Sequence, residues 1–249
     1  MSPAHSAEGR LWLSARRYWI PASRIQLAAV ATARHGEEGA CQMSKEIDKI
    51  GADIPWMTID DVVMNRLREF ARNGRVVAFD TETTGGTVND EICQIGAVEI
   101  VKGKIGEKKN IYIRPGCPID PFAESVHGLS ADFLSRNGRD PRDAMQEFFA
   151  FLGTESLLVA HNVPFDVGMV RIECSKYGIV DQTRTVATCD TVALARFLLP
   201  TTKNLRLWNL IEELGVDGDN SHDAMDDALA CGLVFLKLLE KDETARKAP

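Results

Sequence analysis

The feature that most constrains this chain is an apolar run that ends in two carboxylates. Residues 75–86 read RVVAFDTETTGG. The run predicts a strand buried on both faces, and side-chain alternation along it puts Asp80 and Glu82 on the same face. Two carboxylates so placed repel each other unless a cation lies between them. The turn that follows has exposed amides and hydroxyls, so the stretch indicates a site for a hard metal ion beside a phosphate or sugar.

Taken alone, this pattern favours an ordinary strand end with solvated acids, and the composition and the downstream sequence must decide. The net charge of −7 argues against a protein that holds nucleic acid through phosphate contacts alone, unless metal ions supply local positive charge. The six cysteines are scattered, without a C-x-x-C pair, which argues against a disulfide framework or a zinc site. We therefore expect a reducing compartment, the cytoplasm. No apolar run approaches the ~18 residues of a membrane span.

The chain divides into four expected parts. Residues 1–57 are a flexible N-terminal extension, whose basic start faintly resembles an organelle transit peptide and in which Met43 is a hypothetical translation start. Residues 58–74 form an N-terminal helix that begins at Thr58. Residues 75–240 form the main domain, and 241–249 form a polar, frayed C-terminal tail.

Turn signals and hydrophobic periodicity predict the order of the elements. The expected strands are 76–82, 91–101, 110–114, 157–160 and 186–189. The expected helices are 58–73, 121–126, 130–136, 141–152, 164–177, 190–199, 204–214 and 222–240. Three strands in a meander, followed by strands that alternate with helices, predict an α/β fold with a mixed sheet and helices on both faces.

A second acidic segment follows the fourth expected strand, where α/β folds place ligands. His161–Asp166 reads HNVPFD. Pro164 suits the first turn of a helix, which puts Asp166 near the helix start. A lone Asp there also favours the helix dipole, so a purely structural role remains the alternative for this residue taken alone.

The third acidic segment, SHDAMDDA at 221–228, contains three aspartates that helical geometry separates. At ~100° per residue, Asp227 lies on an apolar stripe, whereas Asp223 and Asp226 lie on a more polar one. The apolar stripe contains Ala224, Cys231, Val234 and Leu238, and the polar one contains Ala230 and Lys237. A carboxylate at the mouth of a buried stripe is costly unless it is paired or metal-bound, so Asp227 is the candidate ligand and the other two are predicted to be solvated. His222 is a surface or capping residue, or else a general base.

Four carboxylates and one histidine from three separate segments fit one chemistry. Hard oxygen ligands bind Mg²⁺ or Mn²⁺ rather than zinc. Two such ions ~4 Å apart can clamp a scissile phosphate. Each segment alone is a weak signal, and the ordered set is a strong one.

The ordered set resembles the DEDDh 3′–5′ exonuclease family, the DnaQ-like group that includes the proofreading subunits of bacterial DNA polymerases. The motifs that carry this resemblance are F-D-x-E-T-T-G at Phe79–Gly85, I-G-A-V at Ile95–Val98, V-H-G-L at Val126–Leu129, H-N-x-x-F-D at His161–Asp166 and H-x-x-x-x-D at His222–Asp227. The resemblance covers about 75–240 and implies an RNase H-like fold with a five-stranded mixed sheet flanked by helices.

The resemblance also implies roles for individual residues. These are the metal ligands Asp80, Glu82, Asp166 and Asp227, the general base His222, and the nucleotide-contacting residues Thr83, Thr84 and Asn162. For the last three, stabilising a turn is an equal alternative, and His127 is expected to be structural. One departure concerns Gly86, where family members commonly carry a bulky apolar residue that wedges against the terminal base. Stacking at the 3′ end is therefore expected to be weaker or to come from elsewhere.

The function expected from these features is a metal-dependent 3′–5′ exonuclease that acts on single-stranded nucleic acid, with DNA favoured, and releases nucleoside 5′-monophosphates. The alternatives are a proofreading subunit bound to a DNA polymerase, an RNA-directed 3′ exonuclease, and a binding module without activity. The presence of all five catalytic residues argues against the last. A proofreading subunit normally needs a tail beyond the nuclease domain to bind the polymerase. Since only about nine residues follow the last expected helix, a stand-alone nuclease or one with another repair partner is favoured over a polymerase subunit. The motifs leave the choice between DNA and RNA open, as well as the oligomeric state.

Overall fold

The computed structural model describes residues 59–247 of the chain. The expected extension 1–57, with Met43, and the expected helix start at Thr58 lie outside the described residues. Within 59–247, no helix is long and apolar enough to cross a membrane.

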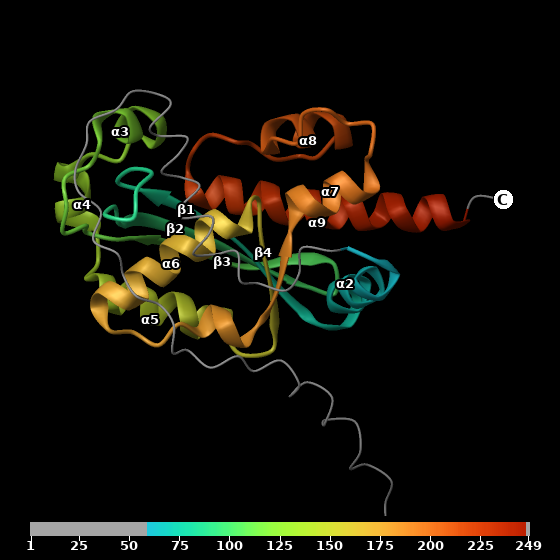
Figure 1. Ribbon diagram of the computed structural model, residues 1–249, viewed down its shortest axis with the longest axis horizontal. Helices are drawn as coiled ribbons and strands as arrows, with labels where there is room; N and C mark the ends of the chain where they lie inside the picture. The colour runs from blue at the N-terminus through green and yellow to red at the C-terminus, as the bar shows by residue number, and fades with distance from the viewer. Residues whose placement is uncertain (1–58, 248–249) are drawn as a thin grey trace, which may run out of the picture. The chain divides into compact units, whose positions relative to one another are not determined.

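A five-stranded mixed sheet runs through the described part of the chain (Figure 1). Its order is β3-β2-β1-β4-β5, with β1 antiparallel to β2 and parallel to β4. The outer pairs are β2–β3, which is antiparallel, and β4–β5, which is parallel. The strands are β1 (Arg75–Thr83), β2 (Ile92–Val101), β3 (Lys104–Tyr112), β4 (Ser156–Ala160) and β5 (Ala187–Asp190). This arrangement confirms the expected α/β class with a five-stranded mixed sheet.

The central strand β1 is buried on both faces because its apolar residues are continuous. Phe79 packs into the core on one face of the sheet, whereas Val76 and Ala78 pack into the core on the other. Because side chains alternate along a strand, Asp80 and Glu82 lie on the same face as Val76 and Ala78. The strand therefore delivers both carboxylates to one side of the sheet.

The third strand was expected at 110–114, but β3 runs Lys104–Tyr112. It is an edge strand with mostly exposed side chains, including several lysines. Such charges protect an edge from pairing with other chains, and they mask the alternation from which a strand is recognised. The expectation therefore found a third strand but placed its start too late, because the charges that protect the edge hide the first residues of β3.

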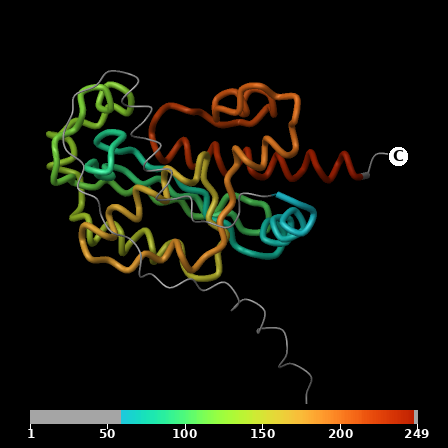
Figure 2. Tube along the Cα trace, in the orientation of Figure 1, coloured from blue at the N-terminus to red at the C-terminus, as the bar shows by residue number. Residues whose placement is uncertain are grey.

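Two helical layers cover the sheet (Figure 1). The core on the Phe79 face is shared with α5 and α6, and the core on the Val76 face with α2, α7, α8 and α9. The helices are α2 (Asp61–Asn73), α3 (Pro121–His127), α4 (Ala131–Asn137), α5 (Pro141–Leu152), α6 (Val163–Tyr177), α7 (Thr191–Leu198), α8 (Leu207–Leu214) and α9 (Ala224–Lys247), with a 3₁₀ turn at Gln182–Thr185. Figure 2 shows how the chain leaves β5, forms α7 and α8, and returns into α9.

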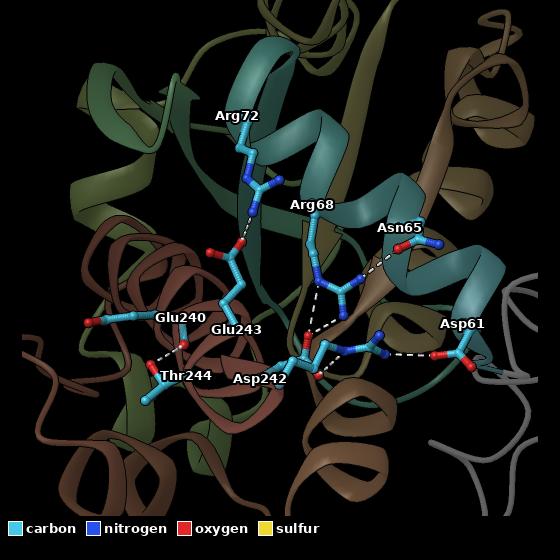
Figure 3. Close-up of polar contacts among 9 residues, drawn as sticks. Asp61, Asn65, Arg68, Arg72, Glu240, Asp242, Glu243 and Thr244 are labelled. Carbon is cyan, nitrogen blue, oxygen red and sulfur yellow. Dashed lines mark hydrogen bonds and ion pairs between the residues drawn. The ribbon is translucent and has the colours of Figure 1, made fainter. Parts of the chain in front are cut away.

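The last helix continues to Lys247, beyond its expected end at 240. Its C-terminal turns pair with α2 (Figure 3). Asp242 accepts hydrogen bonds from Arg68, and both side chains are almost fully buried. Arg246 binds Asp61 at 2.6 Å. A polar C-terminal sequence therefore forms a helix because residues from α2 neutralise its acids, which the local pattern does not reveal.

The N-terminal helix α2 packs on the domain through Met64, Leu67 and Ala71, which join the core on the Val76 face. Its N-cap is Asp60, whose Oδ1 accepts a hydrogen bond from the Val63 amide at 2.8 Å. An acid at this position satisfies an amide that the first turn leaves unpaired. The helix α2 thus docks on the sheet through its apolar residues and on α9 through its charged ones.

Candidate active site

Asp227 reaches the face of the sheet that carries Asp80 and Glu82 because α9 begins very close to β2. Gly96 is the register partner of Asp80 in β2. A Cβ at this position would lie 2.0 Å from the carbonyl oxygen of Ala224, at the start of α9. Glycine is therefore required there, and it lets the first turn of α9 lie against the sheet.

The residues of the expected apolar stripe are buried, and Asp227 is only 5% exposed. Asp226 is exposed, as expected. Asp223 is half-buried rather than solvated, because its Oδ1 accepts a hydrogen bond from the Met225 amide and its Oδ2 accepts one from Gln94. Ala230 was expected on the polar stripe but is fully buried, because the chain at Gly218 passes so close that a Cβ there would lie 3.2 Å from the Ala230 Cβ.

Asp166 approaches the site from the other layer, in the first turn of α6. It is 3% exposed. The Thr81 amide and hydroxyl donate hydrogen bonds to its Oδ1 at 3.0 and 2.8 Å. Thr81 lies between Asp80 and Glu82 in β1 and points to the α6 face, so one strand positions acids on both of its sides.

Burial raises the pKa of all four carboxylates, and the charges of the others add to this for Asp80 and Glu82. Burial, followed by the charges of Asp166, Glu82 and Asp227, raises the pKa of Asp80 well above its ordinary value. Burial, followed by the charges of Asp227 and Asp166, raises the pKa of Glu82 to about 8. Burial also raises the pKa of Asp166 to about 7, against the hydrogen bonds from Thr81. Such a cluster stays ionised at neutral pH only with a cation among its members.

The donor set fits a hard divalent cation. Ligand atoms of Glu82, His222 and Asp227 lie within 4.8 Å of one another. Asp227 Oδ2 accepts a hydrogen bond from Asn220, whereas its buried Oδ1 has no hydrogen-bond partner among the described residues. A buried carboxylate oxygen without a partner is costly, and a metal ion would satisfy it.

His222 is exposed and lies just before α9 in the left-handed region, with φ of 56°. This conformation is uncommon for a residue other than glycine. It turns the chain from the preceding loop into the helix, beside Glu82 and Asp227. The imidazole thus lies at the open side of the acidic cluster, where it is accessible to solvent.

Asn162 also adopts the left-handed conformation, with φ of 74°, at the N-cap of α6. Asp190 holds it there, since Asp190 Oδ1 accepts hydrogen bonds from the amides of Asn162 and Val192, both at 3.0 Å. The neighbouring His161 shares a 2.8 Å hydrogen bond with the Thr191 hydroxyl. Burial lowers the pKa of His161 to about 4, so this ring is neutral at pH 7.

Sequence reasoning missed Asp190 and Thr191. Asp190 ends β5 and Thr191 follows it, as Ala160 ends β4 and His161 follows it, and the two strands are parallel neighbours with Ala160 opposite Asp190. The rule that ligands gather at the carboxyl ends of parallel strands would have identified them.

The hydroxyls of Thr83 and Thr84, where β1 ends, form hydrogen bonds within the adjoining turn. Thr84 is fully buried, its hydroxyl pairs with Asp90 and it accepts a hydrogen bond from the Glu91 amide. The Thr83 hydroxyl donates to the Gly85 carbonyl at 2.7 Å. His127 has its Nε2 3.2 Å from the Thr83 carbonyl and accepts from the Leu129 amide at Nδ1, so both ring nitrogens contact the backbone.

A cavity of about 690 Å³ opens at the acidic cluster. Its lining includes Asp80, Asp227, His222, Asn162 and residues of α8. Thr83 and Thr84 do not belong to that lining. Of the three expected nucleotide-contacting residues, Asn162 is therefore the one that the structure brings to this cavity.

Comparisons with known proteins place this arrangement in a family. The sequence model of the exonuclease family, of RNase T type, matches residues 77–235. The chain is 38% identical over 169 residues to the 3′-5′ exonuclease DinG of Bacillus subtilis, a match that covers 67% of this chain and 18% of that protein. It is 33% identical over 174 residues to the PolC-type DNA polymerase III of Caldanaerobacter subterraneus, which covers 70% of this chain and 12% of that protein. The chain thus spans less than a fifth of the length of either relative.

Solved structures show the same fold. The zinc-bound complex of E. coli ExoI with single-stranded DNA matches with a TM-score of 0.60 and 21% identity, over 70% of this chain and 42% of that one. E. coli exonuclease I with a dT13 oligonucleotide matches with a TM-score of 0.59 and 20% identity, over 69% and 42%. The fold is RNase H-like, as expected. Because the family model spans most of the described residues and its motif segments meet at one site, the chain belongs to the DnaQ-like 3′–5′ exonuclease family.

Proposed function

We propose that this chain is a metal-dependent 3′–5′ exonuclease that hydrolyses phosphodiester bonds at the 3′ end of single-stranded nucleic acid and releases nucleoside 5′-monophosphates. The observation that carries the proposal is the clustering of four carboxylates and one imidazole from three segments, beside a cavity that Asp80, His222 and Asp227 line. The substrate that we favour is DNA, supported by a relative named as a DNA polymerase and by structural neighbours crystallised with DNA.

The residues that would hold two Mg²⁺ or Mn²⁺ ions are Asp80, Glu82, Asp166 and Asp227. Their all-oxygen donor set and the unpartnered Oδ1 of Asp227 support this assignment. When bound, the ions would supply positive charge to the phosphate and a nucleophile at neutral pH.

The remaining work falls to side chains of this chain. His222 is the proposed general base, and it would accept the proton of the attacking water at an imidazole nitrogen that is open to solvent. Asn162 is the proposed contact to the terminal nucleotide, since it is exposed and lines the cavity. Thr83 and Thr84 would act indirectly, because their hydroxyls hold the turn after β1.

The test is degradation of single-stranded DNA and RNA of one sequence, labelled at either end, with Mg²⁺, with Mn²⁺ and with chelator. We expect loss of the 3′ label as a mononucleotide, progressive shortening of the 5′-labelled strand, and no reaction in chelator. Endonucleolytic fragments, release of 5′-terminal nucleotides, or full activity in chelator without bound metal would overturn the proposal.

A role in DNA repair or replication beside a polymerase is a proposal that rests on the PolC-type relative. A cytoplasmic location is supported by the cysteines within 59–247, which are free thiols. The tagged chain, purified from its own cells, tests the proposed role beside a polymerase. Co-purification of a polymerase or a repair protein would support that role, and recovery of the chain alone would contradict it.

A further inference from the structure

The cavity at the acidic cluster extends to the start of α8. Its lining joins Asp80, His222 and Asp227 to Arg206 and Trp208. Figure 1 shows α8 beside α9, the helix that carries Asp227. A strand held at the carboxylates therefore shares its space with a guanidinium and an indole ring.

Core packing does not account for the tryptophan at position 208. The helix α8 buries Leu207, Leu210 and Leu214 against α9, at the spacing of one helical face. Trp208 lies off that face and remains 47% exposed. An indole left open beside a cavity offers a flat apolar surface for another ring.

Arg206 lies at the N-cap of α8 without a side-chain capping hydrogen bond. It is exposed, and it forms no ion pair with any residue of the range 59–247. In a cavity that Asp80 and Asp227 also line, a cation with no acidic partner in that range can contact an anionic group of the substrate. The backbone phosphate of a nucleic acid is such a group.

Gly86, in the turn after β1, has no side chain that could stack on the terminal base. At Gly86 a Cβ would meet nothing within 4 Å, so the space beside this residue is open. Trp208, in contrast, brings an exposed aromatic ring to the cavity.

We infer that Trp208 is the platform on which a base next to the scissile bond stacks, and that Arg206 contacts a backbone phosphate of the same strand. This inference rests on the proposed exonuclease function. Single-strand binders combine aromatic rings with positive side chains in this way, and stacking tolerates every base because each has a π face. The predicted specificity is therefore for unpaired 3′ ends, with little preference among the bases.

The first test compares Trp208→Ala and Trp208→Phe with Phe197→Ala. Phe197 is a matched control, since it is 45% exposed on the adjacent helix α7 and does not line the cavity. We expect Trp208→Ala to raise KM for single-stranded DNA by about 5–150-fold, the range that stacking of one base on an aromatic ring produces. Trp208→Phe should restore most of the affinity, and Phe197→Ala should match the wild type.

The second test separates stacking from a general effect on folding. An abasic residue is placed in turn at each of the last three positions of the oligonucleotide. At the stacked position it should weaken the wild type and leave Trp208→Ala unchanged. If no position gives an effect that depends on Trp208, the inference is overturned even if the variant is slow.

A third measurement follows Trp208 directly. Replacing Trp12, Trp19 and Trp56 with Phe leaves Trp208 as the single tryptophan. In chelator, where hydrolysis stops, an oligothymidylate should quench its fluorescence. If this single-tryptophan protein degrades DNA when metal is present but shows no quenching by the oligothymidylate in chelator, the inference is overturned.

The arginine has its own test. Arg206→Gln should reduce the slope of the logarithm of the binding constant against the logarithm of the salt concentration by about 1, the equivalent of one phosphate contact. Arg142→Gln, at an exposed arginine of α5, should leave that slope unchanged. Equal slopes for both variants would remove Arg206 from the site. If the wild type degrades no 3′ end, the proposed function itself fails, whereas normal degradation by Trp208→Ala contradicts the stacking platform alone.

Discussion

Replacing Gly96 with alanine tests whether contact between β2 and α9 sets the position of Asp227. The added Cβ would lie 2.0 Å from the Ala224 carbonyl oxygen and 2.4 Å from the Met225 backbone nitrogen. Both obstacles are backbone atoms, so no side-chain rotation relieves the clash. The first turn of α9 must move, and it carries Asp227 with it.

The size of the effect follows from this geometry. Ordinary contact begins at 3.4 Å, so the start of α9 must retreat by about 1.4 Å. A misplacement of about 1 Å can cost about 10²-fold in rate, and we expect at least that loss of turnover from Gly96→Ala. Overpacking of this kind destabilises by about 1–3 kcal/mol, which lowers Tm by about 2–12 °C for a domain of this size.

The assay measures single-turnover degradation of a 3′-labelled oligonucleotide together with the thermal melt. Gly106→Ala is the matched control, because Gly106 lies in β3 and its Cβ would meet the carboxylate end of Glu99, a side chain that can move. The control should keep the wild-type rate and Tm within a few degrees. Wild-type turnover in Gly96→Ala would refute the argument that this close approach positions the ligand.

Four further outcomes are expected. Asp227→Ala should abolish hydrolysis in a folded protein while Asp226→Ala stays near wild type; the reverse result in the same assay would show that the ligand is assigned to the wrong aspartate. His222→Ala should lower turnover by about 10²–10⁴-fold yet keep metal binding in calorimetry, and an unchanged turnover would exclude it as the base. Without metal, Tm should fall as the pH rises from about 5 to 8. The reason is that the pKa of Glu82 is raised from 4.5 to about 8, so that the folded state binds a proton that the unfolded state has released. Mg²⁺ should then raise Tm more at pH 8 than at pH 5, and an equal rise at both pH values would contradict this linkage. Arg68→Ala should destabilise by about 1.5–3 kcal/mol in denaturant melts, since it removes the charged hydrogen bonds from Arg68 to Asp242 and leaves that carboxylate paired with Arg246 alone, and a loss below about 1 kcal/mol would show that this contact contributes little.

The sequence predicted most elements within a few residues, because local patterns specify them. The buried run of β1 and the Pro and Gly that bound α6 need no distant partner to be read. The helical stripe likewise predicted that Asp227 is buried and Asp226 exposed. The edge strand β3 and the end of α9 escaped the same reading, since their polar residues are explained by protection of the edge and by pairing with α2.

The sequence by itself determined which segments carry acids, because the period of a strand or helix decides which face a side chain takes. Only the tertiary structure decided how those acids are held. Thr81 binds Asp166, Asp190 binds Asn162, and Gly96 lets α9 approach the sheet. Each of these contacts joins residues far apart in the chain, and such pairs meet only once the sheet and its two helical layers have packed.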